Sequence, residues 1–126
     1  KFVAHNMHEI GMDHLWVFRH ESICINSCLD RSQSILLSCS VDDYDFLVSF
    51  VYASNSYIKR RELWEELQVS SRRMDHPWIS MGDFNIVLRP EEKTGGNFNR
   101  VFASDFSICL DQCNFVEVLI AGAEFT

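Results

Sequence analysis

The 126-residue chain is 47% hydrophobic and 23% charged, which excludes intrinsic disorder and leaves room for one domain with a core. Its formal net charge of −7 has the wrong sign for a protein that holds nucleic acid by broad neutralisation of phosphates. No run of residues approaches the roughly 18 apolar residues of a membrane span, and the first twenty residues lack the apolar centre of a signal peptide. We therefore expect an intracellular protein, in the nucleus or the cytoplasm, without a membrane partner.

Residues 1–34 show no clear period, and we treat them as a divergent N-terminal segment that precedes a domain over residues 35–126. His8 and His14, with Glu9 between them, superficially resemble a zinc-protease motif. That motif needs its two histidines four residues apart on a helix, and these two are six apart. We expect no metal site in this segment.

The five cysteines, an odd number, suit a reducing compartment and predict free thiols. Cys24 and Cys28 are four residues apart, as are Cys109 and Cys113, and in a helix this spacing places both members of a pair on one face. Zinc knuckles usually use the tighter C-x-x-C turn. The spacing therefore favours thiols buried in the core over a metal site.

Two neighbouring strands are predicted in the middle of the chain. β-prone apolar runs at residues 35–41 and 46–52 flank a turn at Asp42 and Asp43. The second run is almost continuously apolar, which is typical of a central strand covered on both faces.

Two helices are predicted after this pair of strands. Leu63, Trp64 and Leu67 form the buried stripe of a helix over residues 55–74. Apolar positions that repeat at intervals of four and three residues predict a second helix over residues 100–113.

Basic residues gather on the first of these helices. Lys59, Arg60 and Arg61 interleave there with glutamates, an arrangement that forms pairs between residues four apart. We interpret this patch as an ordinary solvated face rather than a binding surface.

Short apolar runs at residues 78–82 and from Val116 onward predict two further strands. The predicted order is therefore strand, strand, helix, strand, helix, strand. This order indicates an α/β (α+β) fold in which helices pack on a sheet.

The strand over residues 78–82 runs into the string Gly82-Asp83-Phe84-Asn85. Alternation along an extended chain would place Asp83 and Asn85 on one side and turn Phe84 into the core. A carboxylate and a carboxamide that project together can activate water and position a phosphate. The same four residues also make a good turn, so both interpretations stay open at this point.

These residues stand in a longer pattern that resembles the endonuclease domain of plant LINE-type (non-LTR) retrotransposons, within the endonuclease/exonuclease/phosphatase superfamily. The similarity covers about residues 35–126 and keeps the order and spacing of the family's elements. It rests on the following strings: Val51-Tyr52-Ala53-Ser54-Asn55, Arg61-Glu62-Leu63-Trp64-Glu65-Glu66-Leu67, Gly82-Asp83-Phe84-Asn85, Pro90-Glu91-Glu92-Lys93-Thr94-Gly95-Gly96-Asn97, Phe106 with Leu110-Asp111-Gln112-Cys113, and Gly122-Ala123-Glu124-Phe125-Thr126.

The resemblance implies a partial four-layer β-sandwich flanked by helices, which hydrolyses phosphodiesters of DNA with Mg²⁺ or Mn²⁺. Asp83 would orient or deprotonate the attacking water, and Asn85 would hold that water or a phosphate oxygen. Tyr52 would contact the phosphate, with Asn55 behind the tyrosine as its support. Without the resemblance, Tyr52 could equally be a strand-end residue with a packed ring and a solvated hydroxyl. If the fold is right, these four residues should converge on one rim of the sheet.

The sequence also departs from the family. The metal-binding glutamate of an early strand has no convincing counterpart, since Glu9 and Glu21 are poor candidates. The family's closing Asp-His would lie beyond Thr126, and Ser54 stands where proline is common. We therefore expect a catalytically incomplete fragment that contributes no metal ligand and does not hold Mg²⁺ or Mn²⁺ stably.

Two alternatives to an incomplete fragment remain. The chain could belong to an active nuclease whose missing parts lie in a longer gene product. It could instead be a non-catalytic binding or scaffold module that reuses the fold, although no specific protein partner can be inferred from the sequence.

Overall fold

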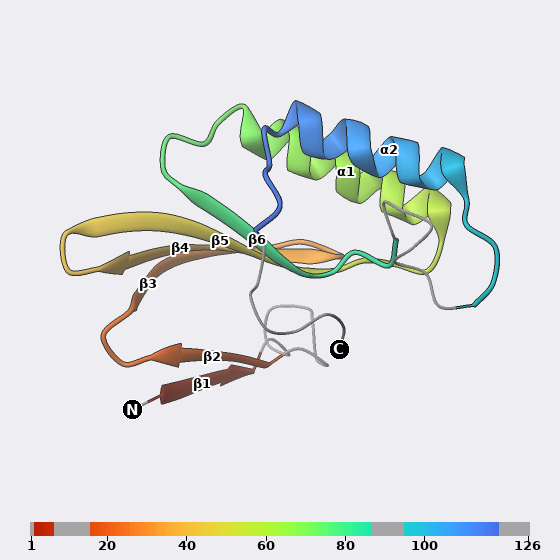
Figure 1. Cartoon of the computed structure of the whole chain (residues 1–126). Helices are drawn as coiled ribbons and strands as arrows, with labels where there is room; N and C mark the ends of the chain where they lie inside the picture. Colours follow the sequence, from red (N-terminus) through yellow and green to blue (C-terminus); the bar gives the residue numbers. More distant parts are fainter. Residues whose placement is uncertain (1, 7–15, 87–94, 119–126) are drawn as a thin grey trace.

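The computed structural model of the chain describes residues 2–6, 16–86 and 95–118. This part of the chain is a mixed α/β structure with a four-stranded sheet, a separate two-stranded sheet and two helices (Figure 1). The elements in chain order are β1 Phe2–Asn6, β2 Trp16–His20, β3 Cys24–Asp30, β4 Ser34–Val41, β5 Tyr44–Tyr52, α1 Tyr57–Ser71, β6 Trp78–Asp83 and α2 Arg100–Gln112.

The main sheet has the strand order β3-β4-β5-β6. β3, β4 and β5 pair antiparallel as a meander, whereas β6 pairs parallel with β5. A parallel pair needs a crossover connection, and α1 provides it between β5 and β6. The predicted strands at residues 35–41 and 46–52 are confirmed as neighbours, and β3 extends the same sheet across the boundary between residues 34 and 35.

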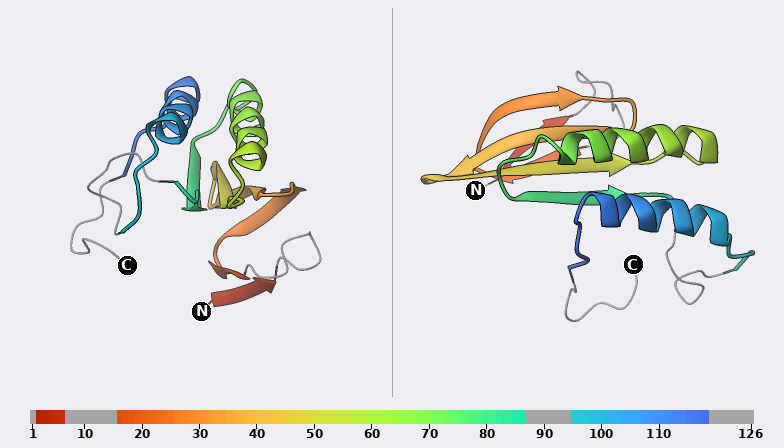
Figure 2. Two further views of the ribbon diagram at one scale, coloured as in Figure 1. Left: turned by 90° about the vertical axis from the view of Figure 1, so that its right-hand side faces the viewer. Right: turned by 90° about the horizontal axis from the view of Figure 1, so that it is seen from above.

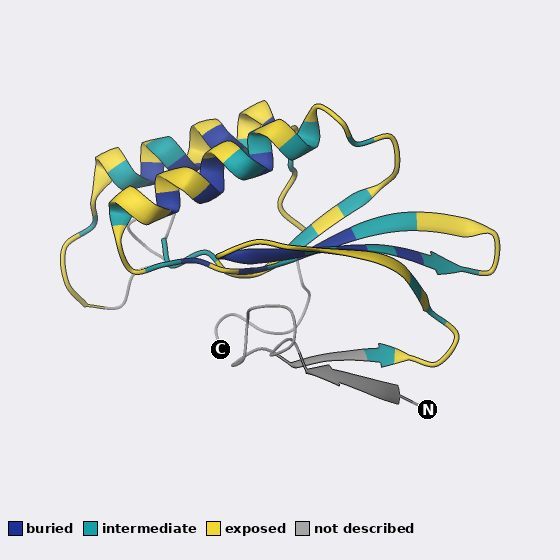
Figure 3. Ribbon diagram, turned by 180° about the vertical axis from the view of Figure 1, so that it is seen from behind, coloured by how far each residue is buried: buried dark blue, intermediate teal, exposed yellow. Residues whose placement is uncertain are grey.

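Both helices lie on one face of the sheet, and the β1-β2 hairpin lies on the other side (Figure 2). In Figure 3 the buried residues of α1 and α2 lie on the sides of the helices that are turned to the sheet. Leu63, Trp64 and Leu67 of α1 are buried there, as the predicted stripe requires. The Trp64 ring stacks on Phe106 of α2 with 4.8 Å between ring centroids. Aromatic packing therefore joins the two helices to each other above the sheet.

A second buried cluster lies on the opposite face of the sheet. Ile35, Leu37 and Cys39 of β4 pack there with Val48 of β5. Val51 of β5 belongs instead to the cluster under the helices. β5 is therefore buried on both faces, which confirms the prediction of a central strand from its continuous apolar run.

The prediction was incomplete for residues 1–34, where the structure forms β1, β2 and β3. Cys24 and Cys28 lie exposed on the strand β3 rather than buried in a helix, so that expectation was wrong. A bulge between Ile25 and Ser27 interrupts the alternation of β3, which explains why the sequence showed no period-two signal. By contrast, Cys109 and Cys113 are buried in the core as predicted.

A strand expected from Val116 onward is absent over the described residues 115–118, and the rest of that segment lies outside the described residues. Neither α1 nor α2, the helices of the described ranges, has the length and apolar character that crossing a membrane requires.

The core under α1 yields a matched test of packing. Leu63 is fully buried, so Leu63→Ala should lower the free energy of unfolding by about 2–5 kcal/mol through lost burial and a residual cavity. Ile58→Ala on the same helix should change it by no more than about 0.5 kcal/mol, because Ile58 is 74% exposed. Urea unfolding followed by circular dichroism measures both values. Equal effects of the two substitutions would contradict the described orientation of α1.

Candidate functional site

β5 and β6 end side by side at one edge of the sheet. Because the strands are parallel and in register, Tyr52 lies directly beside Asp83. Residues paired in register share a face of the sheet, so both side chains project on the face opposite the helices. Tyr52 is 47% exposed, and Asp83 is exposed as well. The ends of β5 and β6 are therefore neighbours, and α1 is the crossover that connects the two strands.

Gly82 allows the end of β6 to approach β5 closely. Its φ is +131°, a backbone conformation that residues with a side chain rarely adopt. A Cβ atom at this position would lie 2.0 Å from the carbonyl oxygen of Val51. One residue further on, the Ala53 amide donates to the Asp83 carbonyl at 2.8 Å. The backbone pairing of the two strands thus continues to the position of Asp83.

Asp83 and Asn85 are brought together by a turn rather than by extended alternation. The Asn85 amide donates to Oδ1 of Asp83 at 2.8 Å, and Asn85 has a φ of +53°. This is the local side-chain-to-backbone turn that aspartate favours. Phe84 between them packs on Trp64 and Phe106, so the expectation that Phe84 points into the core holds.

Asn85 links this turn to the loop after β5. Its Nδ2 atom donates to the Ala53 carbonyl at 2.7 Å. Nδ2 carries two hydrogens, so the second one can be donated to a further acceptor. Asn55 lies two residues beyond Ala53, exposed, in the loop that leads into α1. We call Tyr52, Asn55, Asp83 and Asn85 the rim residues.

Two side chains that sequence reasoning did not assign to the site also reach this loop. Gln33, in the turn between β3 and β4, accepts from the Ser54 amide at 2.8 Å. Arg60 was interpreted as part of a solvated face, but its guanidinium is buried and donates to the Ser54 and Asn55 carbonyls. Burial also lowers the pKa of Arg60. A single glutamine in a turn carries no sequence signal, whereas the position of Arg60 beside the buried Trp64 on the helical wheel could have suggested partial burial.

Among the described residues, no group of three or more His, Cys, Asp or Glu side chains is placed so that it could hold a metal ion. Asp83 contributes a carboxylate to the rim, and one of its oxygens already accepts the Asn85 amide.

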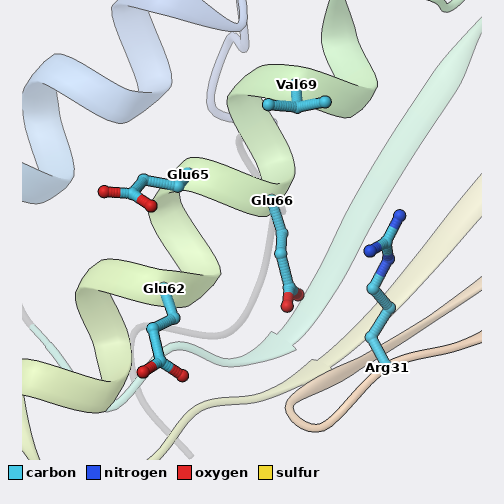
Figure 4. Close-up of a pocket in the computed structure, with 5 residues that line it drawn as sticks. All are labelled: Arg31, Glu62, Glu65, Glu66 and Val69. Atoms are coloured by element: carbon cyan, nitrogen blue, oxygen red, sulfur yellow. The ribbon is translucent and has the colours of Figure 1, made fainter.

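A pocket of about 400 Å³ lies elsewhere, between α1 and the turn that joins β3 to β4 (Figure 4). Arg31, Glu62, Glu65, Glu66 and Val69 line it, and none of the rim residues does. Burial raises the pKa of Glu66, nearby Arg31 lowers it and Glu62 raises it further. Three carboxyl groups around one guanidinium repel anions, so this pocket is unsuited to a phosphate.

No protein-family model matches the chain, and comparison with curated proteins finds no match.

The close approach of β5 and β6 can be tested with two glycines of positive φ. Gly82→Ala should lower the free energy of unfolding by more than about 2 kcal/mol, because strain at its φ adds to the clash with the Val51 carbonyl. Gly95→Ala should cost only about 1 kcal/mol, because its φ is +79° but no atom lies within 4 Å of the added Cβ. Urea unfolding of both variants gives the comparison. A cost at Gly82 no larger than that at Gly95 would show that the strands are not held this closely.

Proposed function

We propose that this chain is a partial endonuclease/exonuclease/phosphatase-type domain of the kind found in plant LINE-type retrotransposons, and that the rim residues bind a phosphodiester of DNA. In this proposal the four-stranded sheet with α1 and α2 forms one half of a four-layer β-sandwich. The observation that carries the proposal is the convergence of Tyr52, Asp83 and Asn85 at one sheet edge. Tyr52 and Asp83 are 31 residues apart in sequence, and unrelated turn residues would have no reason to meet.

Each rim residue has a distinct chemical capacity in this proposal. The Asp83 carboxylate can orient a water molecule or accept its proton. The second N–H of the Asn85 side-chain Nδ2 and the Tyr52 hydroxyl can donate to phosphate oxygens, where negative charge develops during hydrolysis. Asn55 lies exposed on the adjoining loop, three residues after Tyr52 in sequence.

Charge limits what the rim can do alone. The chain has a net charge of −7, and Asp83 stands beside the position where the phosphate would bind. A carboxylate and a phosphate repel each other unless a cation lies between them, and Mg²⁺ commonly joins one or two carboxylates to substrate phosphates. The resemblance assigns Mg²⁺ or Mn²⁺ to this role. We propose that the chain by itself lacks the ligands to keep the ion in place.

Two tyrosines on the same strand allow a matched test of binding. Tyr52→Phe should weaken binding of a fluorescein-labelled single-stranded oligodeoxynucleotide in Mg²⁺ by roughly three- to tenfold, the usual value of one hydrogen bond from a hydroxyl. Tyr44→Phe removes the same hydroxyl at the opposite end of β5, on the same face, from a residue that is 57% exposed, and should leave binding unchanged. Fluorescence anisotropy measures both affinities.

Equal affinities of the two tyrosine variants would contradict the proposal that the rim residues bind the phosphate. Oligonucleotide binding that neither Tyr52→Phe nor Asn85→Ala alters would instead favour the alternative of a binding or scaffold module with its surface elsewhere.

The purified 126-residue chain should not nick DNA. The family's metal-binding glutamate and closing Asp-His have no convincing counterpart in these 126 residues, so we expect the rim to lack a full set of metal ligands and the second acid-base group. Conversion of supercoiled plasmid to the open circle in Mg²⁺, compared with buffer, measures the activity. Nicking that disappears in Asp83→Ala would contradict the expected incompleteness while supporting the role of Asp83.

A further inference from the structure

The loop between β5 and α1, residues 53–56, is bonded along its backbone more fully than a surface connection requires. On one side, Ala53 donates to the Asp83 carbonyl and accepts from the Asn85 side chain, as described above. On the other side, two buried side chains from outside the rim bind Ser54 and Asn55. Loop backbone at a protein surface is ordinarily satisfied by water. In residues 53–56, buried side chains take the place that water has in most surface loops.

Gln33 connects three separate segments. It is 5% exposed, and its backbone carbonyl accepts from the Tyr52 amide at 2.9 Å. Its side-chain Oε1 accepts from the Ser54 amide at 2.8 Å, while Nε2 donates to the Lys59 carbonyl at 2.7 Å. One residue of the β3-β4 turn thus holds the end of β5, the loop and the first turn of α1 in a fixed relation.

Arg60 holds the same loop from the helix side. It is 5% exposed, and its Nη1 donates to the Ser54 carbonyl at 3.0 Å and the Asn55 carbonyl at 2.9 Å. Its guanidinium carbon lies 5.5 Å from the centre of the Phe102 ring of α2, a favourable cation–π distance. The arginine is therefore supported by α2 while it binds the loop, and its charge is used inside the protein rather than presented to a ligand.

We propose that Gln33 and Arg60 are positioning residues of the rim. By fixing the backbone of residues 53–56, they hold Tyr52 and Asn55 where both can reach a phosphate that lies beside Asp83. This inference rests on the proposed phosphodiester-binding function. Its physical basis is that a displacement of about 1 Å in a binding group is enough to lose much of its effect, so a rim on a loop needs independent support.

Four variants test this role. Gln33→Met and Arg60→Met keep similar side-chain length but remove the hydrogen bonds to the loop. Arg60→Lys retains a charged group with three donors, which can serve both carbonyls. Gln68→Met is the control, because Gln68 is a partly buried residue of α1 that interacts with Cys109 of α2 rather than with the loop.

Two measurements are made on each variant of the full chain. Anisotropy with the labelled single-stranded oligodeoxynucleotide in Mg²⁺ measures the affinity of each variant. The affinity should fall by about fivefold or more in Gln33→Met and Arg60→Met, and should stay close to that of the unaltered chain in Arg60→Lys and Gln68→Met. Hydrogen exchange by mass spectrometry should be roughly tenfold faster over residues 52–56 in the first two variants, with the α2 peptides as the reference for global stability.

The outcomes separate the inference from the function on which it rests. Absence of binding by the unaltered chain would contradict the proposed function. Unchanged exchange over residues 52–56 in Gln33→Met and Arg60→Met would contradict the inference even if the unaltered chain binds. Faster exchange with normal binding would also overturn it, because the two residues would then stabilise the loop without positioning the rim.

Discussion

The parallel pairing of β5 with β6 is the interaction on which the rest of this structure depends. Parallel strands cannot be joined by a tight turn, so α1 must cross over the sheet, and its apolar stripe then packs on the strands that it connects. The same geometry brings the carboxyl ends of both strands to one edge. The rim residues are a direct consequence, since each follows or ends one of these two strands.

The aromatic core couples this edge to the body of the protein. Phe84 lies between Asp83 and Asn85 in sequence, and its ring packs against Trp64 of α1 and Phe106 of α2. Anchoring the apolar residue in the core leaves its two polar neighbours at the surface, with little freedom to move independently. The turn residues of the rim are therefore attached to the most buried part of the structure rather than to a free loop.

Electrostatics sets the limits of the proposed chemistry. The protein is acidic overall, and Arg60, which contacts the loop of residues 53–56, has both of its carbonyl contacts inside the protein. A phosphodiester at this edge would consequently be held by local hydrogen bonds and a cation, not by a broad positive field. Such a site is weak until its full set of ligands is present, which agrees with the proposal that the chain is catalytically incomplete.

The sequence by itself determined the elements whose signals are local. The continuous apolar run of β5, the stripe Leu63, Trp64 and Leu67, and the glycine before Asp83 each reflect a requirement of a few neighbouring residues, so they could be read directly. The expectation that Tyr52 and Asp83 meet at adjacent strand ends came from the family resemblance and not from these local signals.

Only the tertiary structure decided the features that depend on partners distant in sequence. The strands of residues 1–34 become recognisable through pairing, because a bulge hides the alternation of β3. The turn at Asn85 is local, but the partner of its side chain, the Ala53 carbonyl 32 residues away, is set by the fold. Gln33 takes its role from a loop that folding brings to it, and no local pattern records a hydrogen bond across 21 residues. A hydrogen bond forms between groups that the fold brings within about 3 Å of each other. The linear sequence does not directly show which groups these are.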